Sequence, residues 1–227
     1  MHLLKLHLQT ADLAATQHFY AEILGLPTHP SGTDRVTVVV GTSTLVFHPA
    51  PASEDPFYHV AFTVPANQIA AAQSWLQARL QLLPVSETDY IADFRNWEAK
   101  SVYFHDASGN ILECIARAPL QNSSTQPFGP DSLLGLSEVG LVVPDVPAYC
   151  RLLEQTHRIL PFPRGPVLPE FATLGTDEGL LIVSGQGRGW VPTRRPAVAY
   201  PLHLTLRHQG TSRIVALDWP PVAGSEA

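Results

Sequence analysis

The stretch YHVAFTVP (residues 58–65) alternates in the way that a β-strand requires. Since neighbouring side chains of a strand point to opposite faces, Val60, Phe62 and Val64 share one apolar face. His59 opens the other face. A histidine at a strand end is commonly half exposed and without a special role, so its meaning depends on what the rest of the chain places beside it.

The order of elements around this strand occurs more than once along the chain, and internal repetition of this kind indicates a modular fold. Residues 3–9 alternate as a strand, Asp12 is suited to cap a helix, and Gly25 is suited to end it. Two β-rich runs follow, with a hairpin turn expected at residues 41–42. The first module is therefore expected to have one strand, one helix and further strands.

A second copy begins with the strand at 58–65. We expect a helix over residues 67–80, followed by two strands joined by the turn DASGN, residues 106–110. A third, weaker copy starts with LSEVGLVVPD, in which Asp145 is the expected helix cap. Only strands are expected after residue 160, so the last part of the chain is one module with extra strands.

Composition narrows the classes of function. With 227 residues and 45% hydrophobic content, the chain has enough apolar material for a sizeable core. A net charge of −6 and scattered basic residues argue against nucleic acid or an anionic membrane as a partner. Cys114 and Cys150 form no zinc or disulfide pattern, and we see no signal peptide or membrane-length apolar run. We expect a soluble cytoplasmic protein.

Three motifs, in this order, resemble the vicinal-oxygen-chelate superfamily, which includes glyoxalase I, extradiol ring-cleaving dioxygenases, and bleomycin- and fosfomycin-resistance proteins. They are LQTADLAATQHFYAEILGL (8–26), YHVAFTVP (58–65) and VYFHDASGNILECIAR (102–117). The resemblance covers residues 1–117, and residues 133–185 match more loosely. It implies an α+β fold in which βαβββ modules form a glyoxalase-like, cup-shaped mixed sheet with the helices outside.

The resemblance and the repeats together divide the chain. We expect a glyoxalase-like domain of two modules at residues 1–118, a linker at 119–132, and a third module with extra strands at 133–227. A lone third module would leave part of a sheet open, which a second copy of the chain could cover. A homodimer is therefore the expected assembly.

Members of this superfamily usually take metal ligands from strand positions inside the cup, two in each module. The resemblance places His59 and Glu113 at the two positions of the second module. In the first module, Lys5 stands at a ligand position and cannot ligate while protonated. His7 and His48 lie two residues beyond the expected positions, so they join His59 and Glu113 around one ion only if the strands are staggered. Such a set suits iron, manganese, zinc or nickel.

The alternative is a cup without a metal. In that case Lys5 pairs with Glu113 and binds an anionic or carbonyl oxygen of the ligand. Tyr103 is placed to donate a hydrogen bond to a substrate oxygen, and Arg95, in a loop expected to rim the cup, is placed to bind a carboxylate or phosphate. The plain structural alternative is an internal salt bridge, with His59 satisfied by hydrogen bonds.

Three classes of function follow for a small-molecule ligand. The first is a metal-dependent lyase or ring-cleaving dioxygenase acting on a small, oxygen-rich substrate. The second is a metal-free drug- or metabolite-binding protein of the bleomycin-resistance type, with Lys5 and Glu113 in the cup. The third is a structural or regulatory protein whose own side chains fill the cup. One fold serves many reactions, so the site must decide between them.

Overall fold

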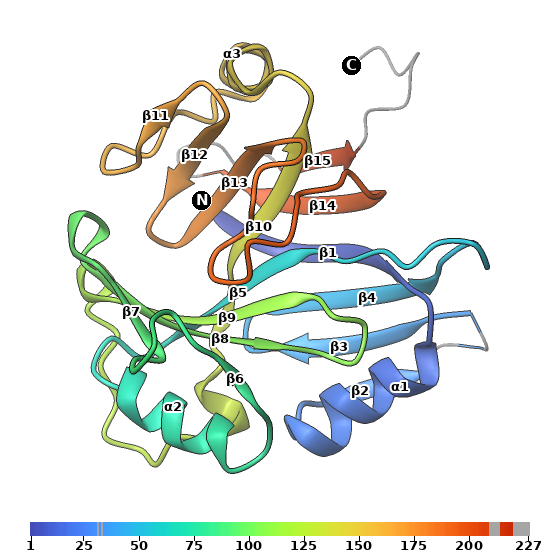
Figure 1. Cartoon of the computed structure of the whole chain (residues 1–227), viewed down its shortest axis with the longest axis vertical. Helices are drawn as coiled ribbons and strands as arrows, with labels where there is room; N and C mark the ends of the chain where they lie inside the picture. The colour runs from blue at the N-terminus through green and yellow to red at the C-terminus, as the bar shows by residue number, and fades with distance from the viewer. Residues whose placement is uncertain (31, 33, 209–213, 220–227) are drawn as a thin grey trace.

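The chain has an α+β fold built around one mixed β-sheet (Figure 1). The structure is a computed structural model that describes residues 1–30, 32, 34–208 and 214–219. Fifteen strands in this described part belong to the sheet. No helix within these residues has the length and apolar character needed to cross a membrane. The predicted α+β class is confirmed.

The first module is β1 (His2–Thr10), α1 (Leu13–His18), a π-helical turn (Phe19–Ile23), β2 (Thr28–Pro30), β3 (Val36–Val40) and β4 (Ser43–Pro49). The helix begins where its cap predicts, because the Asp12 carboxylate accepts a hydrogen bond from the Ala15 amide at 2.9 Å. Gly25 ends the helical segment with a φ of +66°, a left-handed conformation that glycine adopts without strain.

The second module is β5 (His59–Val64), α2 (Ile69–Gln77), β6 (Leu82–Leu83), β7 (Ile91–Phe94), β8 (Ala99–His105) and β9 (Ile111–Arg117). The turn between its last two strands is organised by Asp106. The Asp106 carboxylate accepts hydrogen bonds from the amides of Ser108 and Asn110 at 2.9 and 3.0 Å. Aspartate therefore holds this tight connection as the sequence predicts.

The third module is β10 (Gly135–Val143), α3 (Val146–His157), β11 (Val167–Leu168), β12 (Phe171–Thr176) and β13 (Gly179–Gly185). Asp145 caps α3 through the Ala148 amide at 2.9 Å. A hairpin of β14 (Leu202–Arg207) and β15 (Ile214–Trp219) follows. In the described part of the chain no helix follows α3, as the sequence predicts.

The first strands of the modules pair across module boundaries. β5 is parallel to β9 and antiparallel to β10, whereas β1 is parallel to β4 and antiparallel to β14. We expected a cup formed within residues 1–118. Instead, the second module pairs with the third, and the first module pairs with the C-terminal hairpin and, at Leu3 and Leu136, with the third module. β5 and β10 are buried along their whole length, so each needs a strand partner on both sides to satisfy its backbone hydrogen bonds.

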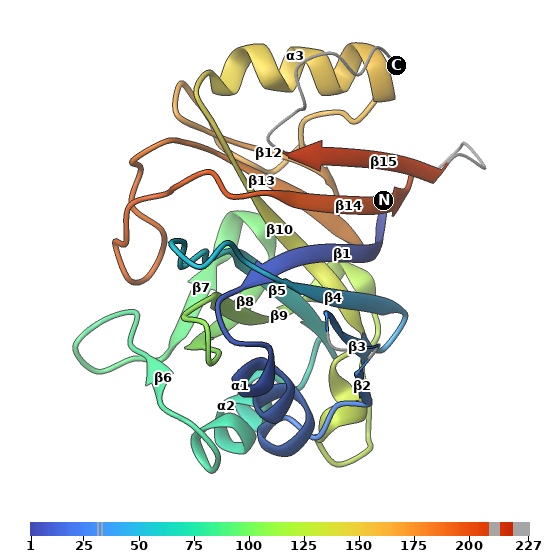
Figure 2. The same ribbon diagram turned by 90° about the vertical axis from the view of Figure 1, so that its right-hand side faces the viewer.

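The helices lie on the outside of this sheet, with α1 against β3 and β4, α2 against β8 and β9, and α3 against β12 and β13. Figures 1 and 2 both show α1 and α2 at one end of the molecule and α3 at the opposite end, with the strands between them. Val60, Phe62 and Val64 belong to the main apolar core, as their alternation predicts. His59 therefore lies on the opposite face of β5.

Candidate metal centre

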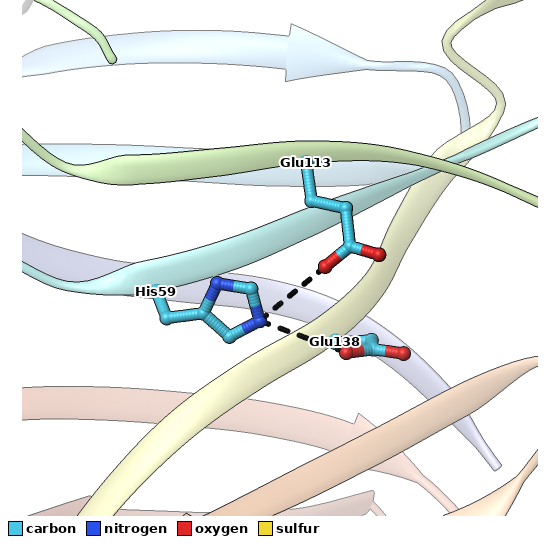
Figure 3. Close-up of side chains that lie close together, drawn as sticks. All are labelled: His59, Glu113 and Glu138. Atoms are coloured by element: carbon cyan, nitrogen blue, oxygen red, sulfur yellow. Dashed lines mark ion pairs between the residues drawn. The ribbon is translucent and has the colours of Figure 1, made fainter. Parts of the chain in front are cut away.

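Three ionisable side chains from three neighbouring strands meet on this face. His59 comes from β5, Glu113 from β9 and Glu138 from β10, and all three are buried (Figure 3). The strand register explains the meeting, because Ala61 of β5 is paired with Glu113 on one side and Glu138 on the other. The imidazole points between the two carboxylates, and its Nε2 lies 3.6 Å from an oxygen of each.

The orientation of His59 is set by two contacts. Its Nδ1 lies 3.2 Å from the carbonyl oxygen of Ile111, and because a carbonyl can only accept, Nδ1 is the donor. The Trp190 ring packs against the imidazole with 5.2 Å between ring centroids. Nε2 is thus the nitrogen directed at the carboxylates. A backbone carbonyl bound to the other ring nitrogen is the usual partner of a metal-ligating histidine.

Glu138 has a cationic partner behind it. The Arg117 guanidinium is fully buried and forms a salt bridge through Nη2 with Oε1 of Glu138. Its Nε donates to the Ser137 hydroxyl at 3.4 Å, and its Nη1 is buried without a hydrogen-bond partner among the described residues. This ion pair compensates one of the two buried carboxylates. The second oxygen of Glu138 remains directed towards His59.

The electrostatics of the group follow from its burial. Burial, and then the charge of Glu138, raises the pKa of Glu113 from 4.5 to about 7. Burial alone would lower the pKa of His59, but its contact with Glu138 and the charge of Glu113 outweigh burial and raise that pKa. Burial, followed by the charge of Glu113, also raises the pKa of Tyr103. The protein thus holds two carboxylates together at a cost that a cation between them would relieve.

A pocket of about 570 Å³ opens onto this group. Aromatic side chains, among them Phe94, Trp97 and Trp190, form part of its wall. Three guanidinium groups also line it; they belong to Arg95, Arg164 and Arg188. Its size and mixed lining are those of a small-molecule site.

The three residues fit a metal ion. One ligand atom from each of His59, Glu113 and Glu138 lies within 4.8 Å of the other two. One imidazole and two carboxylates form an oxygen-rich donor set that suits Fe(II) or Mn(II) and is compatible with Zn(II) or Ni(II). Ile182 of β13, which the strand register places beside Gly140 of β10, also lines the pocket. Its side chain has no atom that can bind a metal, so it adds no fourth ligand. The protein therefore offers three donors with open pocket space beside them.

The structure brings some of the predicted site residues together. His59 and Glu113 meet, and Tyr103 and Arg95 line the pocket that opens onto them. Lys5 does not belong to this pocket: it is exposed on β1, between Thr44 and Thr205 of the adjacent strands. Glu113 is paired with His59 and not with Lys5.

His7 and His48 do not join His59 and Glu113 either. Nδ1 of His7 lies 2.9 Å from Nε2 of His48, so the two form their own pair. The physical reason is the register: β1 pairs with β4 and β14 and not with β5, and the displacement of these histidines by two residues along their strands is not compensated by a stagger. Burial, and then the neighbouring His48 and His203, lowers the pKa of His7 to about 4.

Glu138 is the site residue that the sequence analysis missed. The spacing between strand and helix cap could have identified Glu138. It precedes the cap Asp145 by seven residues, and Lys5 precedes the cap Asp12 by the same number. In the third copy, this spacing makes Glu138 the counterpart of Lys5.

No protein-family model matches this sequence, and a search of curated proteins found no match. Solved structures do resemble it. A protein from Bacillus subtilis subsp. subtilis strain 168 with a provisional dioxygenase name has a TM-score of 0.57 and 17% identity, covering 81% of this chain and 63% of its own length. A variant of glyoxalase I from Zea mays has a TM-score of 0.54 and 14% identity, covering 86% of this chain and 70% of its own.

A variant of the fosfomycin resistance protein FosX from Listeria monocytogenes, complexed with Mn(II), is 18% identical and covers 52% of this chain and 91% of its own, at a TM-score of 0.40. Identities this low bear on the fold and not on the reaction. The chain therefore has a glyoxalase-like fold.

Proposed function

We propose that this protein is a metal-dependent enzyme, a lyase or a ring-cleaving dioxygenase, that acts on a small anionic substrate with adjacent oxygen atoms. The observation that carries the proposal is the buried meeting of His59, Glu113 and Glu138 at the pocket. Two carboxylates are costly to bury together, and a divalent cation held between them offsets that cost. The donor set favours Fe(II) or Mn(II).

The residues of the chain have separate tasks in this proposal. His59, Glu113 and Glu138 hold the ion, which when bound supplies Lewis-acid activation of substrate oxygens. Tyr103 is paired with Glu113 across β8 and β9 and lies in the pocket, where its hydroxyl remains protonated and able to donate a hydrogen bond. Arg95, which lines the pocket, has the task of binding an anionic group of the substrate.

The three proposed ligands are shielded from bulk water, because His59, Glu113 and Glu138 are all buried. Trp190 is buried and packs on His59, and Arg117 lies 5.6 Å from the centre of the Trp97 ring. A low local dielectric strengthens each charge interaction inside the pocket. The aromatic wall of the pocket offers an apolar surface to the carbon skeleton of the substrate.

The metal-free binding protein receives less support, because Lys5 lies on β1 and outside the pocket. The pocket of about 570 Å³ is evidence against the third class, in which the protein's own side chains fill the cup. Three expectations stay predictions from the sequence: the cytoplasmic location, the absence of nucleic-acid and membrane partners, and the homodimer.

The test is a metal analysis of protein purified without an affinity tag. We expect close to one Fe or Mn per chain in the wild type and loss of that metal in Glu138→Gln, whereas the exposed His29→Ala variant keeps it. The loaded protein is then assayed for oxygen uptake with catechols and for lyase activity with dicarbonyl adducts. Metal-free wild-type protein that also fails to bind added Mn(II) would refute the proposal.

A further inference from the structure

A second group of possible metal ligands, made of three imidazoles, lies on the other half of the sheet. His48, His7 and His203 come from the adjacent strands β4, β1 and β14. His7 and His203 are opposite each other in the strand register, and their rings meet edge to face with 5.4 Å between centroids. Nδ1 of His7 and Nε2 of His48 are 2.9 Å apart. None of these residues takes part in the candidate metal centre at His59.

The geometry of the first pair is close to that of two metal ligands. Two nitrogen atoms bound at ~2.0 Å to one tetrahedral ion lie roughly 3.3 Å apart. The 2.9 Å between His7 and His48 therefore needs only a small displacement to admit an ion. Both side chains are half-buried, so their positions are restricted while solvent retains access.

His203 carries the orienting partner that metal-bound histidines usually have. Its Nδ1 lies 2.7 Å from an Asp218 carboxylate oxygen of the neighbouring strand β15. Since a carboxylate accepts, Nδ1 is the donor and Nε2 is left with its lone pair. Nε2 has only a long contact of 3.5 Å with the Thr205 hydroxyl. Among the described residues only the His59 group has all its ligand atoms within 4.8 Å of one another, so His203 must turn towards the other two imidazoles to bind an ion with them.

The charges near the cluster indicate which ion it suits. The carboxylates of Asp218 and Asp34 are opposed by the positive charges of Lys5 and Arg35, so electrostatic attraction for a cation is weak. Binding must then rest on the nitrogen lone pairs. Neutral imidazoles suit Zn(II), Cu(II) or Ni(II), and they suit Mn(II), Mg(II) or Ca(II) poorly.

We propose that His7, His48 and His203 form a second cation site, selective for a nitrogen-preferring divalent ion such as Zn(II), with Asp218 orienting His203. The bound ion joins β4, β1 and β14 and so attaches the C-terminal hairpin to the first module. The site is independent of the proposed function, because it shares no residue with the pocket.

The test is a Zn(II) titration of untagged, chelator-stripped, full-length protein, followed by equilibrium dialysis. We expect two ions per chain in the wild type, one in His203→Ala and one in His59→Ala. His29→Ala, which changes an exposed histidine of β2, retains two. Asp218→Asn is expected to weaken the second ion by roughly 10- to 100-fold. The conservative His203→Gln variant, checked by circular dichroism, separates loss of a ligand from loss of the fold.

Each outcome bears on one of the two sites. One zinc ion that persists in His59→Ala and is lost in His203→Ala supports the second site and counts against the first. Zinc stoichiometry that is the same in wild type, His7→Ala and His203→Ala overturns the second site. Mn(II) is expected to bind His203→Ala as tightly as it binds the wild type; a loss of Mn(II) binding in that variant would also overturn the assignment.

Discussion

Replacing Glu113 with glutamine should stabilise the metal-free protein and abolish metal binding. The pKa of Glu113 is raised from 4.5 to about 7 in the folded chain, so the folded state binds the carboxyl proton more tightly than the unfolded state does. The contribution of this group to stability is fully present below pH 4.5 and is lost as the pH rises through about 7. At 1.36 kcal/mol per pH unit, the loss amounts to about 3 kcal/mol.

Glutamine keeps the shape of the protonated side chain and cannot ionise. We therefore expect the free energy of unfolding of Glu113→Gln to match that of the wild type near pH 4.5 and to exceed it by about 3 kcal/mol at pH 8, with chelator present throughout. His59 remains in both proteins, but the charge of Glu113 helps to raise its pKa, so the difference between the curves reports the carboxylate together with its effect on His59. Urea unfolding followed by circular dichroism measures both curves.

Metal should reverse the order of stability. Mn(II) at 1,000 times its dissociation constant stabilises a protein that binds it by about 4.1 kcal/mol, which exceeds the advantage of Glu113→Gln. Wild-type protein should gain this amount at pH 8, whereas Glu113→Gln should gain nothing. Glu87→Gln, an exposed substitution, is the control and should follow the wild type under every condition. Parallel stability curves for wild type and Glu113→Gln from pH 5 to 8 would refute the reasoning about the buried carboxylate.

Three further substitutions test the fold around the site. Arg117→Met leaves the buried Glu138 carboxylate without its cation, so urea unfolding should show a loss of about 3–5 kcal/mol. Gly41→Ala should cost more than about 1 kcal/mol by the same assay, because Gly41 has a φ of +51° and an added Cβ would lie 2.1 Å from the Leu134 carbonyl oxygen. Asp145→Ala removes the cap of α3 and should lower stability by about 1 kcal/mol, measured by thermal unfolding. An unchanged free energy in any of the three would contradict the corresponding contact.

The local elements of this fold could be predicted from the sequence because short-range chemistry determines them. Asp12 and Asp145 cap helices through amides three residues away, and Asp106 holds its turn within a five-residue segment. The alternation of residues 58–65 separated the core face from the face of His59 in the same way. Each of these inferences needed only the nearest neighbours along the chain.

Strand partnership could not be predicted in this way. β5 pairs with β9 of its own module on one edge, and which strand covers its other edge depends on the long-range contacts that bury most surface. Pairing of that edge with β10 brings Glu138 to His59. The expected displacement of His7 and His48 along their strands is ~6–7 Å, from two residues at ~3.3 Å each. A metal-ligand bond of ~2.1 Å cannot span it. The sequence therefore located two of the three residues of the group but not the third.

The pairing of β1 with β14 has a consequence for biosynthesis. Residues 2–7 emerge from the ribosome about two hundred residues before the strand that covers one of their edges, residues 203–207. A nascent chain therefore carries an uncovered strand edge until residues 203–207 have been made, and such edges favour aggregation. A stop codon ahead of residue 202 would leave that edge permanently open, so shortened chains should depend on chaperones or be degraded even though the residues of the pocket are all present.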